Sequence, residues 1–257
     1  MRALHAEWTK LRTVTGTIWL LLAVVALTVA LSALAASGAS CPAAGCGQDP
    51  AKVSLTGIQF GQAAVAILAV LAISGEYSSG MIGVTFGAMP RRATVLAAKA
   101  AVVSGLALAA GTVAVLASLL VGRLILAGNG FTAAHGFQAL SLADGPVLRA
   151  AAGSVLYLGL IALLSLGVAT VMRDSATAIG VVLALLYLFP IIAAVVADAD
   201  WFRHLQQVGP MTAGLAIQAT TGLASLPIGP WAGLGVLAAW AASALLAGAL
   251  LLHLRDA

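Results

Sequence analysis

The fold is decided by residues 148–197, which read LRAAAGSVLYLGLIALLSLGVATVM (148–172), RDS (173–175) and ATAIGVVLALLYLFPIIAAVVA (176–197). Each apolar run is longer than the roughly 20 residues that a helix needs to cross a bilayer. Neither run alternates apolar and polar residues, as a strand of a membrane β-barrel does. Because a spanning segment must satisfy its backbone hydrogen bonds internally, both runs are predicted to be transmembrane helices. The turn between them is so short that the two helices must form a tight hairpin.

The rest of the chain has the same character. Of its 257 residues, 62% are hydrophobic and 8% are charged, and the mean hydropathy is +1.10, whereas soluble domains carry about 25% charged residues. A water-soluble globular fold is therefore excluded, and no separate soluble domain fits between the apolar segments. We predict an all-α integral membrane protein, a single domain over 1–257 with six transmembrane helices: 16–36, 57–75, 95–122, 148–172, 176–197 and 230–252.

Lysine and arginine residues set the expected orientation, because cytoplasmic loops of membrane proteins carry an excess of them. With a cytoplasmic N-terminus, the inner segments hold eight of these residues and the outer loops hold four. The inner set is Arg2, Lys10, Arg12, Arg91, Arg92, Lys99, Arg173 and Arg255, and the outer set is Lys52, Arg123, Arg149 and Arg203. This distribution predicts a multi-pass protein with both termini in the cytoplasm. Since the net charge of +4 is not gathered into a basic run, nucleic acid is not an expected partner.

The first apolar segment also follows basic residues, as a secretory signal peptide does. A signal sequence has an apolar core of only about 7–15 residues, so segment 16–36 is interpreted as an uncleaved span, with a signal peptide as the less favoured alternative. Before it, apolar residues and one threonine recur at helical spacing: Leu4, Trp8, Leu11 and Thr15. They predict an amphipathic helix over 1–15 on the cytoplasmic leaflet, and a plain charged leader is the alternative.

Proline and glycine mark two irregular places in the second half of the chain. Pro190 lies within segment 176–197 and removes one backbone donor, so that helix is predicted to bend or unwind locally. Residues 208–226 are too broken by glycine and proline for a span and too apolar for an open loop. We expect a re-entrant helical hairpin there, dipping into the outer leaflet.

No catalytic constellation is evident. The sequence contains no G-x-x-x-x-G-K-[ST], no H-E-x-x-H and no G-x-S-x-G pattern. Its charged residues fall near span ends or in loops, which leaves little for an ion relay. The candidate pathway or interface residues are therefore the few unusual positions within the spans: Gln59, Gln62, Tyr187 and Pro190, with Tyr157 elsewhere in the bundle. The polar ones are expected either to face a substrate cavity or to hydrogen-bond between packed helices.

Two further patterns concern local packing. Cys41 and Cys46 lie in the first outer loop, where an oxidising exterior permits a small disulfide loop, although free thiols fit the sequence equally well. A metal site is disfavoured because two cysteines do not complete a tetrahedron.

Small residues repeat every four positions along segment 95–122: Ala110, Ala114, Ser118 and Gly122. This stripe favours close packing within the chain over a dimer interface.

The connection between the second and third spans, residues 76–92, is polar at both ends and apolar between them. Residues at helical spacing give it one apolar face: Tyr77, Met81, Val84 and Ala88. Glu76 suits the positive amino end of such a helix and Pro90 ends it. An amphipathic helix in this place fits either the membrane surface or a groove on a partner.

The pattern Glu76…Gly80…Thr85…Pro90-Arg91-Arg92…Lys99 resembles the signature between spans two and three in permease subunits of bacterial type-2 ABC exporters. The likeness extends from the leader EWTKLR (7–12) to the Arg255-Asp-Ala tail, which is common in actinobacterial members. It implies an inner connecting helix in the leader, a coupling helix in 76–92 that docks on an ATPase, and outer re-entrant helices at 208–226. The residues that it implies for ATPase coupling are Glu76, Tyr77, Gly80, Met81, Thr85, Pro90, Arg91, Arg92 and Lys99.

The function implied by this resemblance is that of a permease subunit in the bacterial cytoplasmic membrane, which forms the pathway for an amphipathic or hydrophobic substrate such as a drug, lipid or peptide. No enzyme activity and no cofactor are expected on this chain, since ATP and Mg²⁺ would be bound by the separate ATPase subunit. The chain would pair with a second copy or a related permease, with spans two and five at their interface, and would contact membrane lipids. Gly83 and Gly87 depart from the family pattern and each weaken the coupling helix by about 1 kcal/mol relative to alanine, so it is expected to form fully only against its partner.

Other functions stay open at this point. A non-transporting scaffold or sensor subunit could use the same inner helices to hold a partner. A secondary transporter is less favoured, because ionisable groups are missing from the middle of the spans. An intramembrane enzyme would need a nucleophile and a base at one depth, and the sequence suggests no such pair.

Overall fold

The structure, a computed structural model, describes residues 15–42, 46–78, 92–195 and 198–255, and these residues form helices and loops without a strand. Six helices are long and apolar enough to cross a membrane. They are α2 (Thr15–Gly38), α4 (Ile58–Ser78), α6 (Arg92–Gly128), α7 (Gly145–Met172), α8 (Ser175–Val195) and α11 (Pro230–Arg255). This confirms the prediction of an all-helical chain with six helices suited to span a bilayer.

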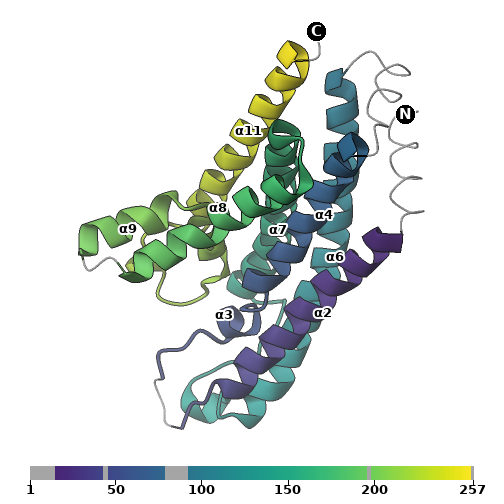
Figure 1. The fold of residues 1–257 in the computed structure, drawn as a ribbon. Helices are drawn as coiled ribbons and strands as arrows, with labels where there is room; N and C mark the ends of the chain where they lie inside the picture. Colours follow the sequence, from purple (N-terminus) through teal and green to yellow (C-terminus); the bar gives the residue numbers. More distant parts are fainter. Residues whose placement is uncertain (1–14, 43–45, 79–91, 196–197, 256–257) are drawn as a thin grey trace.

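The centre of the bundle is formed by α4 and α7, which pack against each other. In each of them, 61% of the most apolar stretch is buried, compared with 17% in α2 and 22% in α8 and in α11. Helix α7 also packs against α6 and α11, and α2 packs against α4 and α6 (Figure 1). Helices with so much apolar surface on the outside are typical of a protein that faces lipid.

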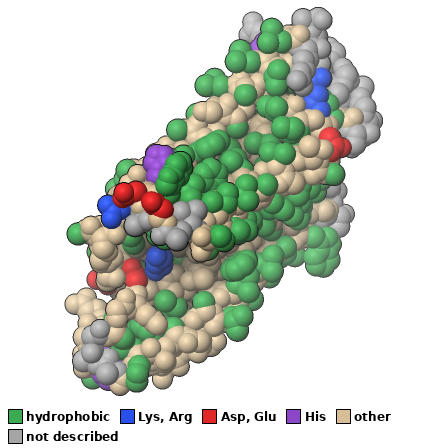
Figure 2. All heavy atoms as spheres, turned by 60° about the vertical axis from the view of Figure 1, so that its left-hand side comes forward, with side chains coloured by type: hydrophobic (Ala, Val, Ile, Leu, Met, Phe, Trp, Pro, Cys, Tyr) green, Lys and Arg blue, Asp and Glu red, His purple; other side chains and the backbone are tan. Residues whose placement is uncertain are grey.

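The outer surface has the distribution of residues that a bilayer requires. Large apolar side chains stand exposed along the outer helices, for example Leu34, Leu124, Leu246 and Leu250. Figure 2 shows hydrophobic side chains covering much of one face, with charged side chains gathered toward its margins. The chain is therefore described as a multi-pass membrane protein.

The two ends of the bundle are named here by their residues. The Lys99 end contains the end of α4, the start of α6 and the turn between α7 and α8. The disulfide end contains the end of α2, the short helix α3 (Pro50–Ser54), the end of α6 and the start of α7 (Figure 1). Because the six helices alternate in direction, the start of α2 and the end of α11 belong to the Lys99 end.

Helix α6 is longer than the predicted span 95–122, since it runs from Arg92 to Gly128. Gly122 does not end it. A side chain at Gly122 would lie within van der Waals overlap of the Ser54 side chain, so this glycine permits α3 to approach α6. The small-residue stripe is accordingly inside the chain, where Ala114 and Ser118 are fully buried. At 1.5 Å per residue α6 is about 55 Å long, compared with about 30 Å for the hydrocarbon core of a bilayer.

The tight hairpin between the fourth and fifth spans is present. Helix α7 ends at Met172, and Arg173 adopts a left-handed conformation (φ 60°) in which its N–H donates to the carbonyl of Ala169 at 2.9 Å. Asp174 then accepts a hydrogen bond of 2.7 Å from the Thr177 N–H at the start of α8. That hydrogen bond lowers the pKa of the Asp174 carboxyl. Two residues thus reverse the chain.

Helix α8 continues through Pro190 to Val195 without an unwound turn. Of the two predicted outcomes, local unwinding is therefore wrong, and the bend stays a prediction. Proline removes one backbone donor, yet α8 extends five residues beyond Pro190.

The connection between α8 and α11 is a chain of short helices. They are α9 (Ala199–Val208), α10 (Pro210–Gly214), η2 (Leu215–Gln218) and η3 (Leu223–Ser225). Residues 210–219 are mostly buried against α7 and α11, which explains why this segment is too apolar for an open loop. The helix α9 was missed in the sequence. It begins at the N-cap Asp198, whose carboxylate accepts from Asp200 N–H and Trp201 N–H at 3.0 Å, and it exposes Trp201.

Two predicted elements lie mostly outside the described residues. They are the amphipathic helix over 1–15 and the central part, 79–91, of the coupling segment 76–92. Helices α4 and α6, which flank the second of these, are described.

Candidate functional site

The nine residues implied in ATPase coupling divide into two groups. Gly80, Met81, Thr85, Pro90 and Arg91 lie outside the described residues. The others belong to the helices on either side: Glu76 and Tyr77 to the last turn of α4, and Arg92 and Lys99 to the first turns of α6. The coupling segment thus connects two helices of the bundle, and the contacts of those helices decide what it could move.

Lys99 points into the chain, where its side chain is 2% exposed. Its Nζ donates a hydrogen bond of 3.2 Å to the carbonyl of Ala72 on α4. A buried ammonium group is unfavourable unless it is hydrogen-bonded, so this side chain holds α6 and α4 together near the end of the bundle.

The end of α4 is also attached to the α7–α8 turn. The guanidinium carbon of Arg173 lies 5.5 Å from the centre of the Tyr77 ring, which is within the range of a cation–π interaction. Close by along the chain, the Ser175 hydroxyl donates to the Ser74 hydroxyl at 2.8 Å. We name these contacts, together with Lys99–Ala72, the α4 anchor. Through them the end of α4 contacts α6, α7 and α8.

Three of the unusual polar side chains and the backbone carbonyl of Gln59 meet in the middle of the bundle. The Tyr157 hydroxyl on α7 donates to Oε1 of Gln62 on α4, and both side chains are completely buried. Nε2 of Gln62 donates to the Gln59 carbonyl at 2.9 Å and contacts Sδ of Met211 on α10 at 3.1 Å. The Tyr187 hydroxyl on α8 donates to the same Gln59 carbonyl at 2.5 Å. These five residues form the central polar cluster, which joins α4, α7, α8 and α10.

The sequence left open whether these polar residues face a substrate cavity or hydrogen-bond between packed helices. Gln62, Tyr157 and Tyr187 hydrogen-bond to groups of neighbouring helices, which is the packing alternative. Buried polar groups in a membrane bundle act in this way as links between helices. Pro190 follows Tyr187 by three residues on α8 and contributes no polar group to the cluster.

The segment 210–218 fits closely onto α7. Gly214 lies against the Tyr157 ring, since a Cβ at this position would be 2.7 Å from Cε2 of the tyrosine. Gly153 on α7 leaves the space that Ile217 occupies. Nε2 of the buried Gln218 lies 3.4 Å from both the Leu55 carbonyl and the Ser154 hydroxyl. Movement of this segment would therefore displace α7 through these contacts, and α4 through the contact of Met211 with Gln62.

At the disulfide end, one carboxylate connects two loops that are distant in the sequence. Asp49 is the N-cap of α3 and accepts from the backbone N–H groups of Ala51 and Lys52 at 3.1 and 3.2 Å. It also accepts from the N–H and the hydroxyl of Thr220, at 2.5 and 2.7 Å, and from the Thr221 N–H at 3.1 Å. The sequence gives no sign of this contact, because the partners are 171 and 172 residues apart.

Replacing Asp49 by alanine is expected to destabilise the chain by about 1 kcal/mol or somewhat more, since both a helix cap and a charge-assisted set of hydrogen bonds are lost. The measurement is thermal unfolding of the purified chain in detergent. Asp144→Ala is the matched control, because Asp144 is the N-cap residue of α7 and its side chain makes no cap hydrogen bond. Equal losses in the two variants would show that neither the cap of α3 nor the contact with Thr220 contributes to stability.

Cys41 and Cys46 form a disulfide, with their Cα atoms 5.8 Å apart. Cys41 is buried, and its N–H donates to the Asn129 carbonyl at 2.9 Å. Nδ2 of Asn129 in turn donates to the Ala36 carbonyl at 3.0 Å. The disulfide loop therefore helps to tie the end of α2 to the end of α6, next to the edge-to-face pair Phe131 and Phe137.

A membrane-impermeant maleimide is expected to label intact cells at Cys46 only after treatment with an impermeant reductant, because the thiols are joined and an oxidising exterior preserves the bond. Mass spectrometry of the labelled peptide makes the measurement. Labelling without reductant, or labelling only in inverted vesicles, would contradict the disulfide or its exterior location respectively.

No protein-family model matches the chain, and no curated protein sequence matches it either.

Proposed function

We propose that the chain is the membrane-spanning permease subunit of an ATP-driven exporter of the ABC type, coupled to a separate ATPase through residues 76–92. The observation that carries this proposal is the α4 anchor. The coupling segment begins at the end of α4 and leads into α6. The two helices are joined to each other there, and α4 is joined in addition to the α7–α8 turn. A force on the segment would thus act on four of the six long helices.

Helix α4 offers a rigid path from the anchor to the middle of the membrane. Gln62 lies ten residues before Ala72 on the same helix, a distance of about 15 Å at 1.5 Å per residue. A shift of α4 along or about its axis would disturb the contacts of Gln62 with Tyr157 and Met211. In this account, closure of the ATPase subunits moves α4, and the central polar cluster converts that movement into a rearrangement of α7, α8 and α10.

A second permease copy is expected to meet α8 rather than α4. The sequence-based hypothesis placed spans two and five at the interface between permeases. Helix α4 is largely covered by its own chain, whereas α8 exposes Leu188, Ile191 and Val195. The substrate is expected to be amphipathic or hydrophobic, because the exposed surfaces of the spans offer few polar groups.

Site-specific photo-crosslinking tests the proposed docking. A photoreactive residue in place of Met81 is expected to crosslink to a protein that carries a phosphate-binding loop, identified by mass spectrometry as an ABC ATPase. The same residue in place of Leu142, at the disulfide end, is the control and should give no such product. Crosslinks from position 81 only to lipid, or only to proteins without that loop, would contradict the proposal and favour an anchor or a scaffold.

A further inference from the structure

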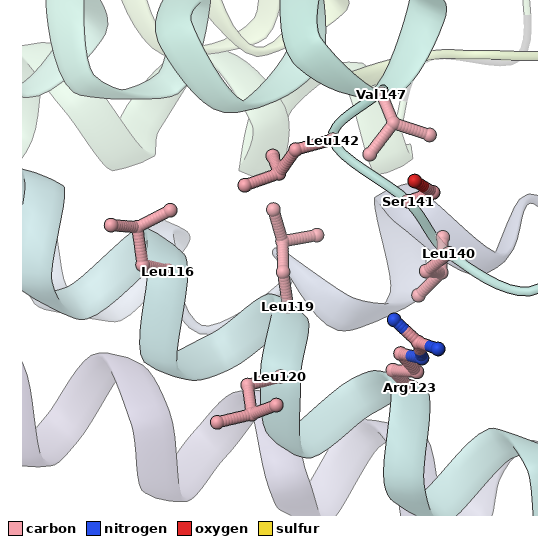
Figure 3. Close-up of a pocket in the computed structure, with 8 residues that line it drawn as sticks. All are labelled: Leu116, Leu119, Leu120, Arg123, Leu140, Ser141, Leu142 and Val147. Carbon is pink, nitrogen blue, oxygen red and sulfur yellow. The ribbon is translucent and has the colours of Figure 1, made fainter. Parts of the chain in front are cut away.

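A narrow hollow opens on the side of the bundle near the disulfide end. Its volume is about 190 Å³, and it lies between α6, the loop before α7 and the first turn of α7. Figure 3 shows Leu119, Leu142 and Val147 facing one another across it, while the Arg123 side chain extends at one end toward Leu140 and Ser141. The hollow is thus an apolar groove with a cation at one end.

Arg123 is unusual for its surroundings. It is exposed on α6 between Leu120 and Leu124, whose side chains are 60% and 69% exposed. In the described part of the chain no carboxylate pairs with its guanidinium and no acceptor is hydrogen-bonded to it. A cation on an apolar, lipid-facing surface is unfavourable unless it reaches the headgroup region or finds an anion there.

The position of Arg123 along α6 matches the headgroup level. It follows Lys99 by 24 residues on one continuous helix, which is about 36 Å at 1.5 Å per residue. The hydrocarbon core is about 30 Å thick, so with Lys99 near one boundary, Arg123 reaches the other. Leu119 and Leu116 precede Arg123 by four and seven residues and lie about 6 and 10 Å deeper.

Space for a headgroup continues beyond Arg123. A larger hollow of about 650 Å³ shares Arg123 and Leu140 with the groove, and its lining includes the polar side chains of Thr132 and Gln138. In the groove itself, the Ser141 hydroxyl oxygen accepts from the Ala143 N–H at 3.2 Å. The hydroxyl hydrogen of Ser141 can therefore be donated to a bound oxygen atom.

We propose that Arg123 and the groove bind one anionic phospholipid. The lipid phosphate pairs with the Arg123 guanidinium and accepts a hydrogen bond from Ser141. One acyl chain lies along Leu116, Leu119 and Leu142 toward the middle of the bilayer. This site depends on the chain being embedded in a bilayer and is independent of any ATPase partner.

Native mass spectrometry of the purified full chain tests the site with two lipids of identical acyl chains, phosphatidylglycerol and phosphatidylcholine. The first molecule of phosphatidylglycerol is expected to bind about fivefold more tightly, which is the contribution of one cation near a membrane surface. Arg123→Gln should abolish this preference and Arg123→Lys should retain most of it. Arg203→Gln is the matched control at another exposed arginine and should leave the preference unchanged.

Two further arms distinguish a lipid site from a phosphate site. Leu142→Trp is expected to fill the groove and weaken binding of both lipids, although Arg123 is still present. Glycerol phosphate, which has the charge without the acyl chains, should not displace phosphatidylglycerol at equal concentration. The proposal is overturned if the native chain shows no preference, if the preference survives in Arg123→Gln, or if glycerol phosphate competes as well as the lipid.

Discussion

Replacing Gly167 with alanine is expected to destabilise the chain by about 2–3 kcal/mol, because the added methyl group overpacks a close helix contact. A Cβ at Gly167 would lie 2.6 Å from both the backbone carbon of Ala244 and the backbone nitrogen of Leu245. These are main-chain atoms of α11, so the clash can be relieved only by separating α7 from α11. The measurements are the yield of monodisperse protein and its unfolding temperature in detergent.

The matched control is Gly235→Ala. A Cβ at this position, on α11, meets open space, and alanine is favoured over glycine in a helix by about 1 kcal/mol. The control is expected to be neutral or slightly stabilising. If both variants behave alike, the close approach of α7 and α11 does not exist in the protein.

The second large effect is expected from Gln62→Leu. This change leaves the buried Tyr157 hydroxyl without its acceptor and removes the contact with Met211 on α10. An unsatisfied buried polar group costs about 1–3 kcal/mol, and we expect a loss of about 2 kcal/mol in unfolding free energy. Because α10 loses a link to α4, the same variant should also show faster proteolysis within 198–229.

A double-mutant cycle separates the hydrogen bond from the packing. Tyr157→Phe keeps the ring, which contacts Gly214, and removes only the hydroxyl. In Gln62→Leu with Tyr157→Phe neither partner is left unsatisfied, so the double variant should be more stable than the sum of the two single losses by about 1 kcal/mol or more. Strict additivity would mean that the two side chains do not interact.

The number and type of long helices could be predicted from the sequence because they depend on local composition. A run of apolar residues longer than a bilayer crossing has one structural solution, and the Arg173-Asp174-Ser175 turn leaves no room for anything but a hairpin. The end of α6 was less predictable. Gly122 and Arg123 look like a boundary in the sequence, but this glycine is required by the contact with Ser54, and the helix continues beyond it.

The sites were predictable only in part, because their contacts are between distant residues. Polar residues within apolar spans pointed to Gln62 and Tyr187, and the structure brings them together with Tyr157. Nothing local indicated that Asp49 would bind Thr220, or that Lys99 would turn inward to α4. Helix α9 was missed because its charged face makes it resemble a loop in a chain that is otherwise apolar.

The burial of Lys99 bears on the role of this residue in coupling. The resemblance implied a set of residues that act together in contacting an ATPase. In the structure, Lys99 and Tyr77 contact their own chain. We therefore expect Lys99→Met to preserve association with an ATPase but to weaken the coupling between ATP hydrolysis and movement of the membrane helices. Lys52→Met, at the exposed Lys52 of α3, is the control.

The proposed function is tested by measuring ATP hydrolysis by the chain reconstituted in lipid with a candidate ABC ATPase. Our account predicts activity that requires both subunits, and predicts that Glu76→Ala, or Arg91→Ala combined with Arg92→Ala, abolishes the dependence on the membrane chain without unfolding it. An ATPase rate that is the same with and without the chain, or unchanged in these variants, would contradict the account and favour a scaffold or a gradient-driven transporter.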